Sequence, residues 1–335
     1  MKESVLVTGG AGFIGSHVSR HLLEMGYHVV VLDDLSGGFA ENVLPGAELV
    51  VDSVMNAERI DALFAQHRFS YVFHLAAYAA EGLSHFIKRF NYNNNLIGSV
   101  NLINAAVNYQ VKCFVFTSSI AVYGKGQLPM TEDLVPEPED SYGIAKYAVE
   151  MELRVSHEMF GLNYIIFRPH NVYGENQNIG DTYRNVIGIF MNRIMQGQPM
   201  TVFGDGEQTR AFTYIADVAP IIARSVIVPE AYNQVFNVGA DQAHSVNHLA
   251  EVVAGCMGVE ANIQHLDPRN EVQHAFSDHE KVRRIFQLGE SVPLEQGVAR
   301  MAEWARRVGA RESSIFGEIE IEKNLPASWR LKMGK

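Results

Sequence analysis

The chain has 335 residues, of which 47% are hydrophobic and 19% charged, with 28 glycines and 11 prolines. This is the mixture of an ordinary globular protein of about two domains, and it excludes disordered, collagen-like and low-complexity chains. Lys and Arg number 27 and Asp and Glu 38, so the net charge is −11. A chain this acidic has no overall electrostatic attraction for nucleic acid or for an anionic membrane surface.

The cysteines, histidines and apolar runs bear on compartment and metal content. Cys113 and Cys256 cannot build a disulfide framework or a four-thiolate zinc site. His17 and His21 have the spacing of a helical zinc pair, but no third ligand is evident, so we expect no metal site. No apolar run reaches the roughly 18 residues of a membrane helix, and a strand pattern begins at Ser4, which leaves no room for a signal peptide. We therefore expect a cytoplasmic protein.

Short apolar runs alternate with helical patterns through the first half of the chain. Runs that are apolar throughout are typical of strands in a parallel sheet whose two faces are covered by helices. We predict strands at 5–8, 28–32, 48–51, 71–75, 113–118 and 164–167, and helices at 14–25, 57–67, 91–109 and 142–160. The sequence thus predicts an α/β fold with a doubly wound parallel sheet.

The texture of the sequence changes after Arg168, where segments become shorter and richer in Asn, Gln, Gly and Asp. We predict helices at 245–257 and 294–308 and a strand at 262–266 in this part. The division we expect is a sheet domain at 1–168, to which some later segments return, a smaller C-terminal α/β domain for substrate at 169–311, and a tail at 312–335.

A glycine-rich loop, Gly9-Gly-Ala-Gly12-Phe13-Ile14-Gly15, lies between the first predicted strand and the first predicted helix. In this context it predicts a Rossmann-like dinucleotide site, with the pyrophosphate at the helix N-terminus. Asp33 closes the second strand 24 positions after Gly9, where a carboxylate binds ribose hydroxyls and repels a 2′-phosphate. NAD is therefore favoured over NADP. Asp52 follows the third strand and fits either an adenine contact or a helix cap or turn.

A second pattern places Tyr142 and Lys146 four residues apart, on one face of a predicted helix. The lysine charge should lower the tyrosine pKa and so favour a general base. A Ser-rich strand end, Thr117-Ser118-Ser119, precedes this helix and supplies hydroxyl groups.

Taken together, these motifs resemble the extended short-chain dehydrogenase/reductase family of nucleotide-sugar epimerases and dehydratases. The matching segments occur in family order, nearly to residue 308. They are Thr8-Gly-Gly-Ala-Gly-Phe-Ile-Gly15, His74-Leu-Ala-Ala77, Asn94-Asn95, Ser118-Ser-Ile-Ala-Val-Tyr-Gly124, Tyr142-x-x-x-Lys146, Arg168-Pro-His-Asn-Val-Tyr-Gly174 and Phe203-Gly-Asp-Gly206.

The resemblance implies a bound, recycled NAD and inversion at C4 of a UDP-hexose through a 4-keto intermediate. Tyr142 would take the sugar hydroxyl proton, Ser119 would share that hydrogen bond, and Lys146 would hold the nicotinamide ribose. Family dehydratases carry an Asp-Glu pair after the fifth strand, whereas residues 118–124 hold no carboxylate here, so plain epimerisation leads. The residues that the resemblance assigns to NAD are Gly9, Gly12, Phe13, Ile14, Gly15, Asp33, Asp52, Leu75, Ala76, Ala77, Asn95 and Lys146.

For the nucleotide sugar, the resemblance places Phe203 beside uracil and an arginine on the diphosphate. Arginine suits that role because its planar fork makes paired bonds to phosphate oxygens. Glu81 either faces the sugar, where it would disfavour a uronate, or begins a helix in solvent. The residues predicted to bind substrate are Tyr78, Glu81, Ser118, His170, Asn171, Asn185, Phe203, Arg210 and Arg269.

Two alternatives stay open on the sequence. One is another nucleotide-sugar enzyme of the same family, such as a 3,5- or 2-epimerase, a reductase, or an enzyme of GDP- or dTDP-sugars. The other is a non-enzymatic NAD-sensing regulator, although such regulators often lose the tyrosine that is present here. The helices at 91–109 and 142–160 resemble the pair that forms the family's dimer interface, so we expect a homodimer.

Overall fold

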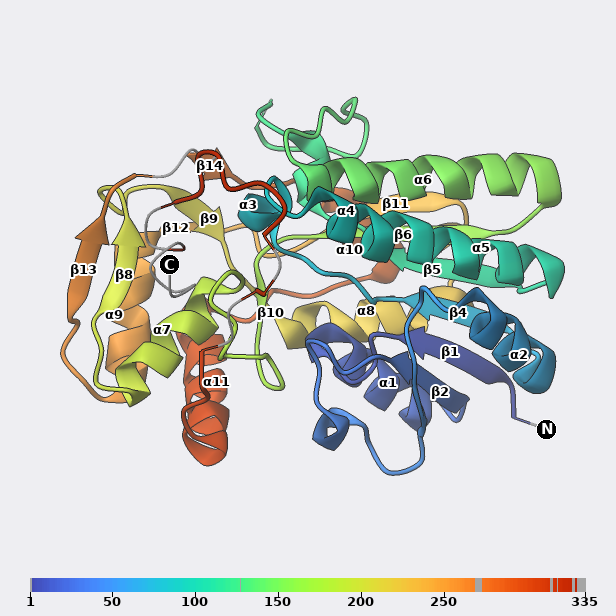
Figure 1. Ribbon diagram of the computed structural model, residues 1–335, viewed down its shortest axis with the longest axis horizontal. Coiled ribbons are helices and arrows are strands. Elements are labelled where there is room, and N and C mark those ends of the chain that lie inside the picture. The colour runs from blue at the N-terminus through green and yellow to red at the C-terminus, as the bar shows by residue number, and fades with distance from the viewer. Residues whose placement is uncertain are drawn as a thin grey trace.

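The computed structural model describes residues 2–126, 128–268, 273–313, 316–317, 319–326 and 329, which form two lobes (Figure 1). The larger lobe is built on a seven-stranded parallel sheet with the strand order β11-β6-β5-β4-β1-β2-β3. Its strands are β1 (Ser4–Thr8), β2 (His28–Asp33), β3 (Glu48–Val51), β4 (Tyr71–His74), β5 (Cys113–Thr117), β6 (Tyr164–Pro169) and β11 (Gln234–Val238).

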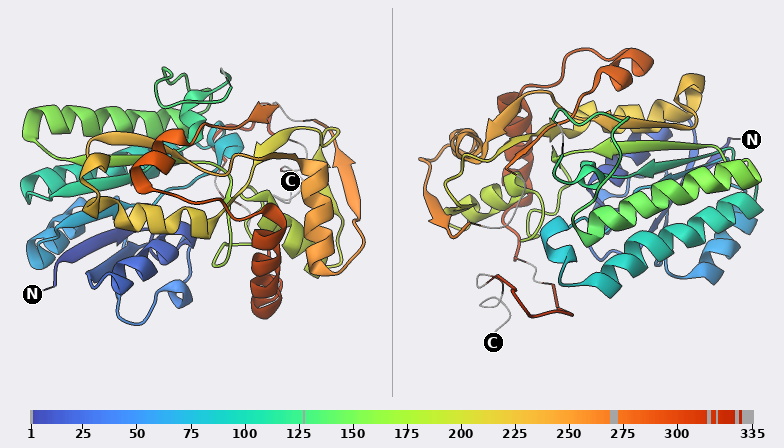
Figure 2. Two further views of the ribbon diagram at one scale, coloured as in Figure 1. Left: turned by 180° about the vertical axis from the view of Figure 1, so that it is seen from behind. Right: turned by 90° about the horizontal axis from the view of Figure 1, so that it is seen from above.

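Helices cover both faces of this sheet because the strand side chains alternate between two apolar cores. Val5 and Val7 share one core with Leu22 of α1, whereas Leu6 shares the other with Phe64 of α2. The two layers are seen from opposite sides in Figures 1 and 2. One layer holds α1 (Phe13–Glu24), α8 (Ala219–Arg224) and α10 (Glu280–Phe286), and the other α2 (Ala57–His67), α5 (Gly98–Asn108) and α6 (Ser141–Phe160).

The smaller lobe combines short strands with three helices. The helices are α7 (Val186–Met195), α9 (Val246–Met257) and α11 (Leu294–Val308), and they share the first apolar core with α1 and α8. The strands pair as β12 (Ala243–Ser245), β9 (Thr209–Ala211) and β14 (His274–Ala275), as β8 (Met200–Phe203) with β13 (Ile263–Leu266), and as β7 (Val172–Tyr173) with β10 (Thr213–Tyr214).

The predicted fold class is confirmed, and the structure adds three segments to the larger lobe that lie late in the sequence. β11 extends the sheet beside β6, α10 lies against β11, and α8 packs on α1. The predicted helix at 91–109 is divided into α4 (Lys88–Tyr92), a π-helical turn at Asn93–Ile97 and α5. Such turns are rare and often mark functional sites.

His74 ties the carboxyl end of β4 to its neighbours. Its ring lies 2.7 Å from the Thr8 hydroxyl and 2.8 Å from the Ser99 hydroxyl. Complete burial lowers the pKa of His74 to about 3. The imidazole is therefore neutral in the folded protein across the physiological range, where it serves both as a hydrogen-bond donor and as an acceptor.

Because His74 takes up a proton only after unfolding, acidification should destabilise the fold between pH 6.5 and about 3. A histidine that stays neutral in the fold costs about 2 kcal/mol of unfolding free energy by pH 5. We expect His74→Gln to be less stable than wild type at pH 7.5 but to lose less stability on going to pH 5. Urea titrations at the two pH values test this, and equal losses in both proteins would contradict it.

Candidate functional site

A cleft of about 2230 Å³ lies between the lobes, at the carboxyl ends of the parallel strands. Small-molecule pockets usually measure about 300–1,000 Å³, so this cleft has room for two sizeable ligands. Ligands of open α/β sheets bind at this edge of the sheet.

The glycine loop forms one end of the cleft. Gly9 has a left-handed backbone (φ +71°), and a Cβ there would lie 2.7 Å from the Ala76 nitrogen. A Cβ on Gly15 would lie 2.1 Å from the Gly9 oxygen, so the first turn of α1 can pack against the loop only without a side chain. No side chain caps α1, whose first amides face the cleft as an anion site. These residues fit a dinucleotide pyrophosphate.

Two carboxylates stand beside this loop. Asp33 accepts hydrogen bonds from the Ala11 and Leu35 amides (3.0 and 2.9 Å), and burial raises its pKa. Asp52 accepts bonds from the Ser53 amide and the Asn56 side chain, and it lines the cleft. Asn56, rather than Asp52, caps α2, so Asp52 is a turn residue and not a helix cap.

The backbone of the loop after β4 is held by hydrogen bonds to the side chains of Thr8 and Asn95. The Thr8 hydroxyl accepts bonds from the Leu75 and Ala76 amides, and the Asn95 side chain bonds both the nitrogen and the oxygen of Tyr78 (2.8 and 3.1 Å). Leu75, Ala76 and Ala77 line the cleft, as does Asn94, while Asn95 is buried beneath them. In the structure, Asn95 therefore shapes the loop that faces the cofactor end rather than the cleft itself.

Ser119, Tyr142 and Lys146 are brought together, as the sequence motifs predict. The Ser119 hydroxyl accepts a bond from the Ala121 amide (3.1 Å) and is hydrogen-bonded to the Tyr142 phenol. Since the amide uses a lone pair of Ser119, the serine proton is available for the phenol oxygen. Lys146 Nζ donates to the Thr117 carbonyl (2.8 Å) and lies 5.7 Å from the centroid of the Tyr142 ring.

Burial controls the charges of this group. It lowers the pKa of Lys146 to about 7, because an ammonium ion loses its hydration there. It also raises the pKa of Tyr142, and the Glu81 charge raises it further, while the hydrogen bond from Ser119 opposes the shift. The lowered tyrosine pKa expected from the Tyr142–Lys146 spacing is thus not found in the protein alone, where burial raises the pKa of Tyr142.

Ser118, predicted to contact substrate, directs its hydroxyl to the buried Glu150 carboxylate (2.6 Å), although the residue borders the cleft. Glu150 and its other partner, Arg168, were not singled out by sequence reasoning. Both are charged residues at positions where the strand and helix patterns predict burial. This conflict is the sequence signal that could have identified them.

The second lobe contributes the opposite wall of the cleft. Asn171 has a left-handed backbone and donates to the Ala211 carbonyl (3.3 Å), and the Asn185 side chain does not cap α7 although it precedes that helix. Phe203 ends β8, and Arg210 on β9 donates to the Thr209 and Gln273 carbonyls. These four predicted residues all line the cleft. Arg269 lies outside the described residues.

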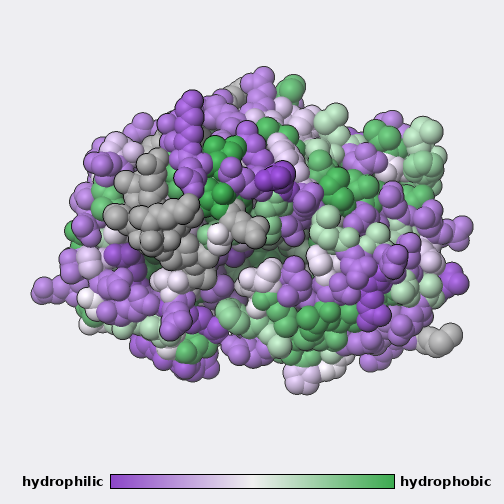
Figure 3. Space-filling model, in the orientation of Figure 1, coloured by the Kyte–Doolittle hydropathy of each residue, from purple (hydrophilic) through white to green (hydrophobic). Residues whose placement is uncertain are grey.

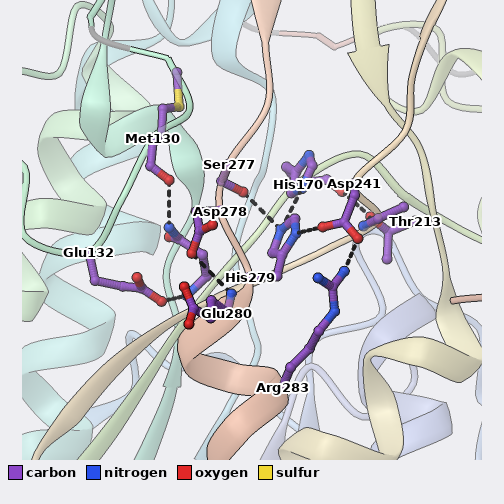
Figure 4. Close-up of polar contacts among 12 residues, drawn as sticks. Met130, Glu132, His170, Thr213, Asp241, Ser277, Asp278, His279, Glu280 and Arg283 are labelled. Atoms are coloured by element: carbon purple, nitrogen blue, oxygen red, sulfur yellow. Dashed lines mark hydrogen bonds and ion pairs between the residues drawn. The ribbon is translucent and has the colours of Figure 1, made fainter. Parts of the chain in front are cut away.

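His170 borders the cleft, but its ring belongs to a buried polar group (Figure 4). It stacks on His279 with an interplanar angle of 4°, and the two Nε2 atoms lie 3.1 Å apart. His279 in turn contacts the Ser277 hydroxyl and the Asp241 carboxylate, which pairs with Arg283. Burial lowers the pKa of His170 to about 3 and that of His279 to about 4, so both are neutral at pH 7.

Tyr78 and Glu81 line the cleft. Described residues of the C-terminal tail (312–335) also line it, which the sequence did not predict. The Arg184 guanidinium lies over the Tyr78 ring, 4.8 Å from its centroid, and Phe316 packs on the same ring. The Glu320 carboxylate accepts bonds from two amides at the start of α4. The described tail residues lining the cleft are Ser313, Ile321, Lys323, Asn324, Pro326 and Trp329. The tail thus packs against the larger lobe.

Two absences hold for the described part of the chain. No group of three or more His, Cys, Asp or Glu side chains there is arranged to hold a metal ion. No helix there is both long and apolar enough to span a bilayer.

Comparison with known proteins identifies the family of this chain. Residues 5–239 match the model of the NAD dependent epimerase/dehydratase family. The UDP-glucose 4-epimerase of Mycolicibacterium smegmatis is 33% identical over 309 residues, covering 90% of this chain and 98% of that protein. A UDP-N-acetyl-alpha-D-glucosaminuronate decarboxylase of Bacillus cytotoxicus is 30% identical over 325 residues, covering 92% and 99%.

Among solved structures, the UDP-glucose 4-epimerase of Thermotoga maritima with UDP-glucose superposes with a TM-score of 0.85 at 36% identity. It covers 91% of this chain and 99% of its own. Fold, glycine loop and relatives therefore agree, and the chain belongs to the NAD dependent epimerase/dehydratase family.

Proposed function

We propose that this protein inverts C4 of a UDP-hexose, with Tyr142 as the general base. The observation that carries the proposal is the arrangement of Ser119, Tyr142 and Lys146 in the cleft, with the Ser119 hydroxyl bonded to the Tyr142 phenol and the Lys146 ammonium 5.7 Å from the centroid of the phenol ring. No carboxylate stands in residues 118–124, where the dehydratases that the sequence resembles carry an Asp-Glu pair.

In this proposal each of the three side chains has a separate task. The Tyr142 phenolate takes the proton of the sugar 4-hydroxyl, and the Ser119 hydroxyl shares that hydrogen bond. The Lys146 ammonium, held by the Thr117 carbonyl, donates to the ribose next to the nicotinamide and favours the phenolate. When bound, NAD supplies acceptance and return of the C4 hydride and a positive charge near the phenol.

The two ends of the cleft fit the two nucleotides of such a reaction. We assign the cofactor to the glycine loop, Asp33, Asp52 and residues 75–77, because uncapped amides and a carboxylate suit pyrophosphate and ribose. We assign the UDP group to Asn171, Asn185, Phe203 and Arg210 on the opposite wall. Phe203 offers a face for the base and Arg210 a fork for the diphosphate.

The reaction can be tested by proton NMR of the protein with UDP-glucose, UDP-N-acetylglucosamine and UDP-glucuronate in turn, with catalytic NAD. We expect the anomeric signal of a C4 epimer. We expect Tyr142→Phe to slow its appearance roughly 10²–10⁴-fold, the usual contribution of a general base.

A Tyr142→Phe variant that binds NAD like wild type and still forms product at the wild-type rate would exclude the tyrosine as base. If none of the three substrates reacts, the reaction proposed here is wrong, and GDP- and dTDP-sugars form the next panel.

The sugar itself is proposed to be neutral. Glu81 lies at the start of α3 (Glu81–Ser84) on the cleft wall, and its charge acts on the Tyr142 phenol. A carboxylate near the reacting end repels a uronate, whose charge would stand beside the same phenol. We therefore expect UDP-glucuronate to be the poorest of the three substrates.

Glu81 also gives a pH prediction. Because its negative charge raises the pKa of Tyr142, Glu81→Gln should lower that pKa. The acidic limb of the kcat–pH profile should then move to lower pH by about half a unit, a modest value for a charge that solvent reaches. Glu139→Gln serves as the control, since Glu139 also lines the cleft but pairs with Lys125. A shift of the Glu81→Gln profile to higher pH would contradict the assignment.

The protein is further proposed to form a homodimer through α5 and α6. Apolar side chains are exposed along one face of α6 at Ile144, Met151, Val155 and Met159, and Met159 is 69% exposed. Hydrophobic surface gathers over these helices at the upper right of Figure 3. A contiguous apolar patch of this kind marks a protein interface.

We expect a dimer in sedimentation velocity runs at micromolar concentration. Met151→Asp should give monomers, because a charge in an apolar interface loses its hydration without gaining a partner. Val135→Asp is the control, since Val135 is 78% exposed and lies outside both helices. A wild-type monomer would refute this interface.

A further inference from the structure

Glu150 is a completely buried carboxylate on α6, one helical turn after Lys146 and two after Tyr142. It accepts hydrogen bonds from the Ser118 hydroxyl (2.6 Å) and from Nε of Arg168 (2.9 Å), while Nη2 of Arg168 completes a paired contact. Arg168 is itself only 1% exposed. The carboxylate is therefore fully satisfied by fixed donors.

The partners of Glu150 come from two strand ends that carry site residues. Ser118 directly follows β5 and precedes Ser119, and Arg168 lies near the end of β6, shortly before Asn171. One carboxylate on α6 thus joins the helix of Tyr142 and Lys146 to both neighbouring strand ends. A shift of α6 along its axis would break all these bonds together.

Arg168 extends the connection toward a third segment. Its Nη1 donates to the Tyr123 hydroxyl (2.7 Å), which donates to Asn237 Oδ1 on β11 (2.8 Å). Asn237 then donates to the Met130 carbonyl (3.0 Å). The short helix at Ile120–Tyr123 is capped by Ser119 at its start, and these bonds hold its other end at Tyr123.

Charge gives Glu150 a second effect. The Lys146 ammonium is 2% exposed and contacts a backbone carbonyl and the rings of Phe116 and Tyr142. Burial disfavours its charge, and the Glu150 carboxylate favours it. A buried cation that no carboxylate supports would lose its proton at lower pH.

We propose that Glu150 is a positioning residue for the reaction, which sets the height of Tyr142 and Lys146 against the Ser118–Ser119 turn and keeps Lys146 charged. The inference rests on the roles proposed above for Tyr142, Ser119 and Lys146. Buried ion pairs can often be replaced by apolar residues without loss of the fold, so the fold alone does not require a carboxylate at this position. A positioning role, by contrast, predicts an effect on the reaction.

The test compares Glu150→Gln with Arg154→Gln. Gln keeps the shape of Glu but removes its charge, whereas Arg154 is half-exposed and lies 4.0 Å from the same carboxylate. In Glu150→Gln we expect kcat to fall about tenfold or more with KM changed less than threefold, as for a loss confined to the transition state. The alkaline limb of the kcat–pH profile should move about one unit lower, since Lys146 loses its proton earlier. Arg154→Gln should match wild type.

A second readout needs no turnover. Isothermal titration of NAD into wild type and Glu150→Gln between pH 6 and 9 reports the charge of Lys146 through the affinity. We expect the affinity of the variant to decline at lower pH than that of wild type. If wild type epimerises no nucleotide sugar, the proposed function fails, while this titration still decides the role of Glu150.

Unchanged kcat and unchanged pH dependence in a folded Glu150→Gln would overturn the inference. So would a loss of kcat in Glu150→Gln with both pH limbs in place, because Gln removes the charge through which Glu150 is proposed to act on Lys146. Should Glu150→Gln not fold, Ser118→Ala carries the positioning claim. We expect it to lower kcat severalfold without moving either limb, and wild-type kcat in that variant would refute the claim.

Discussion

All seven strands of the main sheet run in one direction, and this single constraint assembles the site. Their carboxyl ends meet at one edge, so loops that are far apart in sequence become neighbours there. The glycine loop follows β1, Asp33 ends β2, residues 75–77 follow β4, and Ser118 follows β5. The second lobe faces this edge and closes a cleft over it.

Burial is the dominant electrostatic influence within that cleft. It acts in opposite directions on the two central groups, since it lowers the pKa of Lys146 and raises that of Tyr142. Both changes favour neutral side chains, so Tyr142 is protonated in the protein alone. Within the chain, the hydrogen bond from Ser119 favours the ionised form of Tyr142, and the Glu150 carboxylate favours the charged form of Lys146.

The sequence was most informative where periodicity and motif coincide. The helices at 57–67 and 294–308 and the pairing of Tyr142 with Lys146 follow from spacing, while the place of Ser119 beside them follows from the family resemblance. The sequence could not show which way a motif side chain turns, so Ser118 and Asn95 were expected at ligands although they bond Glu150 and the Tyr78 backbone. β11 was missed because Gln234 and Asn237 interrupt its apolar run, and Asn237 is buried in a polar chain that only the tertiary structure reveals.

The chain does not finish one lobe before it begins the other. After entering the smaller lobe it returns as α8, β11 and α10 to the larger one, with segments of the smaller lobe in between. The chain therefore crosses between the two lobes more than once, and a cut at a single linker would not separate them. In evolutionary terms, the smaller lobe cannot be exchanged as a cassette, and changes to its wall of the cleft must arise by substitutions in place.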